Sequence, residues 1–183
     1  MAQALLIVDI QNDYFPGGRM ELAGSREAAA QAAKLIARFR EKRLPVIHMQ
    51  HVSLRPGATF FLPDTEGVGI HESVAPLAGE TVIEKHFPNS FRETALLDHL
   101  KKAGIDKLAI AGMMTHMCID TTTRAAADLG FACQLAHDAC ATRDLAFGGA
   151  KVAARDVHNA FLAALNGPFA KVVAAADVEA AAA

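Results

Sequence analysis

The sequence predicts an α/β fold of three layers, in which a six-stranded parallel sheet is covered by helices on both faces. Apolar, strand-like runs alternate with helical patterns along the 183 residues. The first run, at 4–8, is apolar without interruption, which is typical of a parallel strand buried on both faces. Right-handed crossovers between such strands place helices on both faces of the sheet. With 52% hydrophobic and 21% charged residues, the chain can bury a core, so we expect one domain over residues 1–183 and no intrinsic disorder.

The elements of the first half follow from local patterns. Ser25 can cap a helix over about 26–42, where large apolar residues recur at helical spacing. A second apolar strand is expected at 45–49. The stretch 53–76 contains several Pro and Gly residues among scattered apolar ones, which predicts an irregular excursion. We expect this excursion to act as a lid or a pocket wall, because long loops in compact domains are commonly functional.

The second half repeats the alternation of strands and helices. Its strands are expected at 81–84, 107–111, 131–136 and 170–173. Its helices are expected at 90–104, 118–129 and 145–165. Ser90 and Glu93 have the spacing of a capping box at the start of the first of these helices. The last helix is Ala-rich and is expected in spite of Gly148 and Gly149.

Charge and cysteine content exclude several classes of protein. The net charge is -2 and no dense basic run is present, so we expect neither nucleic acid nor a membrane surface as a partner. The three cysteines contain no CxxC pair, which suits neither a disulfide framework nor a structural zinc site. The start of the chain lacks the basic segment of a secretory signal, and no apolar run is long enough to span a membrane. We therefore expect a cytoplasmic protein.

Three reactive side chains stand where strands are expected to end. Ligands in parallel α/β sheets bind beyond the carboxyl ends of the strands, and Asp9, Lys85 and Cys118 lie at or near such positions. Cys118 begins a predicted helix, whose free N–H groups and dipole would stabilise a thiolate. Asp9 at the end of a buried strand needs a cation or a proton, and Lys85 is its natural counter-ion. Each residue also has a structural interpretation: a small buried cysteine, a carboxylate bound by backbone N–H groups, and a solvated lysine.

Three segments together resemble a known family. LLIVDIQNDYF at 5–15, VIEKHFPNSF at 82–91 and AIAGMMTHMCIDTTTRAAADLG at 109–130 are similar to the isochorismatase-like cysteine hydrolases, in register over essentially the whole chain. The resemblance implies the strand order 3-2-1-4-5-6 and a catalytic Asp-Lys-Cys triad at Asp9, Lys85 and Cys118. It also implies a cis peptide bond between Met113 and Met114, an oxyanion hole formed by the backbone N–H groups of Met114 and Cys118, and a homo-oligomer, either a dimer, a tetramer or an octamer.

The function implied by the resemblance is hydrolysis of a C–N bond in a small amide, urea or carbamoyl compound, through a thioester intermediate. One alternative is a non-catalytic or thiol-redox-sensing protein on the same fold. Another is a metal-containing nicotinamidase or an isochorismatase, although true isochorismatases lack the nucleophilic cysteine.

We expect no metal and no cofactor. Nicotinamidases of the family bind a metal through an Asp-x-His motif after the second strand, and here Met49 stands where the aspartate would be. His51 and His71, with or without Asp64, could still hold zinc or iron, but we interpret them as ordinary loop residues.

Substrate contacts are expected from aromatic residues near the strand ends. Phe15, Phe60, Phe61, Phe87 and Phe91 lie in or near loops and could form an apolar wall. Of these we select Phe15 and Phe91 as substrate-binding residues, together with His116, which lies two residues before Cys118. The alternative interpretation places the phenylalanines in the core and leaves His116 to satisfy the turn.

Overall fold

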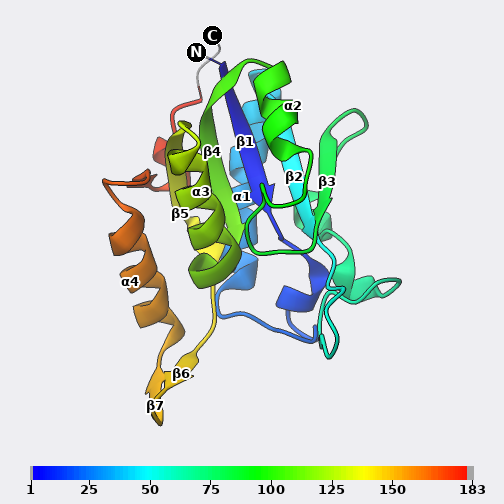
Figure 1. Ribbon diagram of the computed structural model, residues 1–183, viewed down its shortest axis with the longest axis vertical. Helices are drawn as coiled ribbons and strands as arrows, with labels where there is room; N and C mark the ends of the chain where they lie inside the picture. Colours follow the sequence, from blue (N-terminus) through cyan, green and yellow to red (C-terminus); the bar gives the residue numbers. More distant parts are fainter. Residues whose placement is uncertain (1, 181–183) are drawn as a thin grey trace.

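Six parallel strands form the central sheet of the protein, as a computed structural model that describes residues 2–180 shows (Figure 1). The strands are β1 (Ala2–Val8), β2 (Val46–His51), β3 (Thr81–Lys85), β4 (Ile105–Met113), β5 (Ala132–Ala141) and β8 (Lys171–Val173). Their order in the sheet is β3-β2-β1-β4-β5-β8, and every neighbouring pair is parallel. This confirms the expected order 3-2-1-4-5-6, because β8 is the sixth strand of the sheet along the chain.

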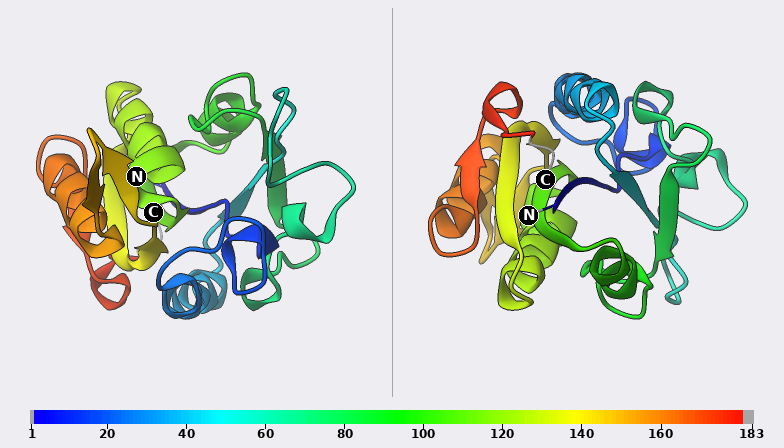
Figure 2. Two further views of the ribbon diagram at one scale, coloured as in Figure 1. Left: turned by 90° about the horizontal axis from the view of Figure 1, so that it is seen from below. Right: turned by 90° about the horizontal axis from the view of Figure 1, so that it is seen from above.

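Helices cover both faces of this sheet, which confirms the three layers (Figures 1 and 2). The helices are α1 (Ser25–Glu41), α2 (Leu96–Lys102), α3 (Asp120–Asp128) and α4 (Ala154–Leu165). Strand β1 contributes to two cores because successive side chains point to opposite faces. Leu5 and Ile7 pack in the core that contains α1, and Leu6 and Val8 pack in the core that contains residues of α2, α3 and α4. This two-sided burial explains why residues 4–8 of the central strand are all apolar.

The capping box expected at 90–93 is wrong. The Ser90 hydroxyl hydrogen-bonds to Thr122 Oγ1 of α3 at 2.8 Å, so it is engaged by a helix that is distant in sequence. Residues 90–95 form turns, and α2 begins only at Leu96, whose backbone N–H donates to Thr94 Oγ1 at 3.3 Å. A tertiary partner for the serine thus outweighs the local pattern, and the helix is shorter than expected.

The single long helix expected at 145–165 is also wrong. Residues at its start form an antiparallel hairpin of β6 (Leu145–Phe147) and β7 (Ala150–Val152). Gly148 and Gly149 make the turn with φ of 57° and 80°, values that glycine adopts without steric cost and that two-residue hairpins require. The hairpin projects beyond the body of the molecule (Figure 1), and Phe147 is 89% exposed. The two glycines therefore specify a turn, and α4 covers only the rest of the segment.

The irregular stretch 53–76 is tied to the loop that follows β1. The Asp13 carboxylate accepts hydrogen bonds from the backbone N–H of Phe61 at 2.6 Å and of Arg19 at 3.1 Å. Gln11 Nε2 donates to the Val68 carbonyl at 2.7 Å. Short helical turns lie in these loops and elsewhere, at Asn12–Tyr14, Glu66–Val68, Glu72–Val74, Thr115–Ile119 and Ala175–Asp177. The excursion is thus held against the end of β1 that carries Asp9.

An ion-pair cluster joins α1 to the β2–β3 edge. Arg40 contacts both carboxylate oxygens of Glu80, at 2.7 and 2.8 Å, and His48 Nε2 lies 3.2 Å from the same carboxylate. The hydrogen bond from Arg40 lowers the pKa of Glu80 to about 2.

Among residues 2–180, no helix is long and apolar enough to cross a membrane.

Candidate active site

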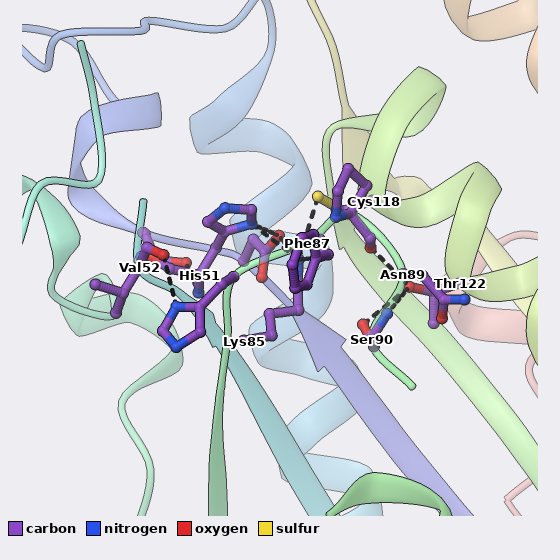
Figure 3. A network of polar contacts seen from close by, with 12 residues as sticks. His51, Val52, Lys85, Phe87, Asn89, Ser90, Cys118 and Thr122 are labelled. Carbon is purple, nitrogen blue, oxygen red and sulfur yellow. Dashed lines mark hydrogen bonds and ion pairs between the residues drawn. The ribbon is translucent and has the colours of Figure 1, made fainter. Parts of the chain in front are cut away.

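Asp9, Lys85 and Cys118 meet at the carboxyl edge of the sheet. Asp9 directly follows β1, Lys85 is the last residue of β3, and Cys118 lies in the turn between β4 and α3. Lys85 Nζ is 2.8 Å from Asp9 Oδ2 and 3.3 Å from Cys118 Sγ. All three side chains are buried, and Cys118 is 4% exposed. Figure 3 shows the Lys85 side chain reaching between His51 and Cys118.

The backbone around β4 brings Cys118 to this position. Gly112 lies so close to β1 that a Cβ there would clash with the carbonyl oxygen of Val8, and its φ is 140°. Glycine is therefore required for the close approach of the two strands. The peptide bond between Met113 and Met114 is cis, as the resemblance implies. The helical turn Thr115–Ile119 follows, contains Cys118 and leads directly into α3.

The Lys85 ammonium has more acceptors than it has protons. Besides Asp9 and Cys118, its Nζ lies 3.0 Å from the Phe87 carbonyl and 3.1 Å from His51 Nδ1. An ammonium only donates, so His51 Nδ1 must accept, and the ring proton of a neutral His51 resides on Nε2. Burial lowers the pKa of His51 to about 4, which keeps the ring neutral near pH 7. Four acceptors thus share three N–H bonds at one buried cation.

Gln11 holds His51 in place. Its Oε1 accepts from the His51 backbone N–H at 2.7 Å, and its Nε2 donates to the His51 carbonyl at 2.9 Å. The His51 ring borders the same cavity as Cys118, and no hydrogen-bond partner for its Nε2 is found within residues 2–180. His51 therefore offers a fixed N–H donor beside the thiol.

The resting Cys118 is a thiol. Burial raises the pKa of Cys118 well above its ordinary value, the charge of Asp9 raises it further, and Lys85 opposes both effects. Burial and the charge of Asp9 thus oppose the thiolate that the sequence pattern predicts at a helix N-terminus. Burial lowers the pKa of the Lys85 ammonium, but its interactions with Asp9 and Cys118 oppose burial, and the pKa of Lys85 lies above its ordinary value.

A carboxylate oxygen of Asp9 is available to take the thiol proton. One such oxygen lies within 4.8 Å of Cys118 Sγ, and no hydrogen-bond donor to Asp9 Oδ1 is found in the part of the chain that the structure describes. A carboxylate oxygen without a donor can accept a proton without losing a hydrogen bond. The geometry thus allows a proton to move from Cys118 to Asp9.

A cavity of about 290 Å³ opens onto the thiol. Its lining is largely apolar and consists of Tyr14, His51, Ser53, Leu54, Arg55, Phe60, His86, Phe87, Pro88, Met114, Met117 and Cys118. Four of these residues belong to 53–76, so the excursion forms a pocket wall as expected. A more open hollow of about 350 Å³ near α4 touches none of the three central residues.

The three residues selected for substrate contact lie elsewhere. Phe15 stacks on His71 with ring centroids 3.5 Å apart, and Phe91 stacks on Phe131 at 6.0 Å. The His116 ring bonds to Thr142 Oγ1 at 2.5 Å. None of the three lines the Cys118 cavity, because each is already engaged by packing or by a hydrogen bond. Of the five phenylalanines considered, Phe60 and Phe87 form the wall.

The residues around the thiol do not fit a metal ion. Within the described chain, one cluster has metal-ligand chemistry, and it consists of Asp9, His51 and Cys118 with ligand atoms within 4.8 Å of one another. Lys85 Nζ contacts all three, so a metal would have to displace an ammonium or be repelled by it. His71 takes no part, since its Nδ1 is bonded to Ser73 Oγ at 2.8 Å.

His51 is a neighbour of the triad that the local sequence pattern did not mark. In the parallel pairing of β2 and β3, His51 lies directly beside Lys85, so both occupy the carboxyl ends of their strands. The expected strand ended at residue 49, so His51 was not recognised as lying at the carboxyl end of that strand. Extending the strand by two residues would have placed His51 at the site. Arg55, Tyr14, His86 and Met117 come from loops and turns, where no local pattern marks a cavity-lining residue.

Comparisons with known proteins agree with this geometry. Residues 3–177 match the family model described as Isochorismatase domain. The uncharacterized isochorismatase family protein YddQ of Bacillus subtilis is 53% identical over 172 residues, which cover 94% of this chain and 96% of the relative. A streptothricin hydrolase of Streptomyces noursei is 34% identical, over 97% of this chain and 61% of the relative. The crystal structure of a putative isochorismatase hydrolase from Oleispira antarctica superposes with a TM-score of 0.93 at 51% identity, covering 96% of this chain and 95% of that one. The chain therefore belongs to the isochorismatase family of hydrolases.

Proposed function

We propose that this protein hydrolyses the C–N bond of a small amide, urea or carbamoyl compound through a thioester on Cys118. The observation that carries the proposal is the single ammonium of Lys85, which lies within bonding distance of both the Asp9 carboxylate and the Cys118 thiol at the inner end of a cavity. A nucleophile, a proton carrier and a charged group that orients both are the parts that covalent acyl transfer needs. Members of the isochorismatase family are hydrolases, which supports the assignment.

The first half of the reaction forms the thioester. Asp9 takes the thiol proton as Cys118 Sγ attacks the carbonyl carbon, and the electron pair of the C=O bond moves to oxygen. The backbone N–H groups of Met114 and Cys118 stabilise that oxyanion. The C–N bond then breaks, and Asp9 gives its proton to the leaving nitrogen. Lys85 remains an ammonium and balances the charge that moves between Asp9 and Cys118.

The second half releases the acid. Asp9 takes a proton from a water molecule as the water oxygen attacks the thioester carbon. The C–S bond breaks, and Asp9 returns the proton to the departing sulfur. One water is consumed, and a carboxylic acid and an amine or ammonia are formed. The His51 Nε2–H is available to hold the substrate or the leaving group during both halves.

The thiol-redox alternative is not favoured. Redox-sensing cysteines are exposed and have a lowered pKa. Burial raises the pKa of Cys118 beyond the ordinary range and raises the pKa of both Cys133 and Cys140 to about 12. All three cysteines are buried and unpaired. The hydrolase is therefore the better account of Cys118.

The test is a screen for ammonia or acid release across small amides, ureas and carbamoyl compounds. We expect Cys118→Ala to lower turnover by roughly 10³-fold or more while the protein stays folded, because the nucleophile is lost. Cys133→Ala is the matched control, since it removes a buried thiol from β5 without touching the cavity. Mass spectrometry of the quenched reaction should detect an acyl group on Cys118. Retained turnover in the Cys118→Ala variant would contradict the proposal.

A further inference from the structure

We infer that the substrate of this site carries a carboxylate, which Arg55 binds at the mouth of the cavity. The inference rests on the proposed function and narrows its substrate to small amides that also bear a carboxylate. It follows from the distribution of charge around the cavity, from the lack of a partner for Arg55, and from the way the chain holds that residue.

Arg55 is the single permanently charged side chain that lines the cavity within the described chain. No aspartate or glutamate belongs to the lining, and the remaining walls are mostly aromatic and aliphatic. Below the thiol, the negative charge of Asp9 is balanced by Lys85 at 2.8 Å. The protein as a whole carries a net charge of -2, so a positive cavity mouth is not a consequence of overall composition. The cavity therefore favours an anion at its outer end.

The Arg55 guanidinium has no ion-pair or hydrogen-bond partner among residues 2–180. Several other arginines are paired, for example Arg40 with Glu80 at 2.7 Å and Arg124 with Asp120 at 3.0 Å. A guanidinium presents five N–H donors in a planar fork that fits a carboxylate in two parallel hydrogen bonds. Arg55 thus keeps its full binding capacity for a ligand.

The loop that carries Arg55 is held in a defined position. The Val52 N–H donates to the Lys85 carbonyl at 2.9 Å, and the Ser53 N–H donates to the Phe61 carbonyl at 2.8 Å. Within this closed loop, the Ala58 N–H donates to the Arg55 carbonyl at 3.2 Å. The backbone of Arg55 is therefore tied to the strand end that carries Lys85, which lowers the entropy lost when its side chain binds a ligand.

Arg55 and the thiol line the same cavity and differ in burial. Cys118 is buried and Arg55 is exposed, and the rings of Phe60 and Phe87 also line the cavity. Burial is the main cause of the low pKa of His51, and the charge of Arg55 lowers that pKa further, so the guanidinium acts on the interior of the site. A short substrate with an amide at one end and a carboxylate at the other would meet both groups.

The turnover test compares matched substrates that differ in charge: succinamate with butyramide, and glutaramate with valeramide. We expect kcat/KM to be about 10- to 100-fold higher for the anionic member of each pair, the range for hydrogen bonds to a charged group. Arg55→Gln should remove this preference through KM, and Arg55→Lys should keep part of it. Arg43→Gln, at an exposed site outside the cavity lining, is the matched control and should leave both rates unchanged. Equal kcat/KM values for the two members would overturn the inference.

A binding test does not depend on turnover. Calorimetry with the Cys118→Ala protein measures the binding of malonamate, succinamate, glutaramate and adipamate. At least one should bind, and Arg55→Gln in the same background should weaken that binding by about 10- to 100-fold. Binding that depends on Arg55 without any turnover by the wild type would refute the proposed function and leave the inference standing. If none of the four binds, or if Arg55→Gln leaves the affinity unchanged, the inference is wrong.

Discussion

Replacing Lys85 with methionine should destabilise the protein strongly, because the ammonium balances a fully buried carboxylate. Lys85 is 1% exposed and Asp9 is 0% exposed. The substitution removes the cation 2.8 Å from Asp9 Oδ2 and adds no other donor. Breaking one side of a buried ion pair costs about 3–5 kcal/mol, a large part of the roughly 5–15 kcal/mol that stabilises a domain. We expect a loss of this size in the free energy of unfolding, measured by urea denaturation followed by circular dichroism.

A second substitution separates charge from packing. Asp9→Asn in the Lys85→Met background removes the uncompensated negative charge, so we expect it to recover most of the lost stability rather than add to the loss. Both single variants and the double variant should lack turnover, since the proton carrier or its partner is missing. The reasoning is refuted if Lys85→Met costs less than about 1 kcal/mol, or if the two losses simply add.

Three further predictions concern the fold and the site. The native pKa of Glu80 lies below its ordinary 4.5, so the wild type should lose stability as the pH falls from about 4.5 to about 2, and Glu80→Gln should remove this contribution. Solvent screening reduces the contribution to about 1–2 kcal/mol. An identical pH dependence of unfolding in both proteins would argue against this prediction. Gly112→Ala should lower the free energy of unfolding by about 3 kcal/mol, because the added Cβ clashes with Val8, whereas Gly148→Ala, which has open space around it, should lower it by only about 1 kcal/mol. Equal effects in urea denaturation would show that β1 and β4 do not approach closely at Gly112. His51→Leu should lower kcat/KM by about 10- to 100-fold, and His51→Gln should lower it by less, because the glutamine amide can both accept and donate hydrogen bonds. If steady-state kinetics gives equal kcat/KM values for the two variants, His51 has no hydrogen-bonding role in the reaction.

Much of the sheet could be predicted from local patterns. Uninterrupted apolar runs marked the buried parallel strands, and their alternation with helical segments implied crossovers with helices on both faces. The same patterns placed Asp9, Lys85 and Cys118 at or just beyond strand ends, where the structure brings them together. The errors arose where a local signal competed with a distant partner or a turn, as at Ser90, which bonds to α3, and at the glycine pair of the hairpin. Assembly into a dimer, tetramer or octamer and a cytoplasmic location stay predictions.

The sequence by itself determined the succession of strands and helices along the chain and which reactive groups stand at strand ends, because strand periodicity and chain connectivity are local properties. The order of the strands within the sheet was implied by the resemblance to the family. Only the tertiary structure decided that Cys118 rests as a thiol, that Lys85 also binds His51, and that Phe60 and Arg55 line the cavity while Phe15 does not. These features depend on burial and on contacts between segments far apart in the chain. A residue's protonation state and its neighbours are set by the packed surroundings, and no window of the sequence contains them.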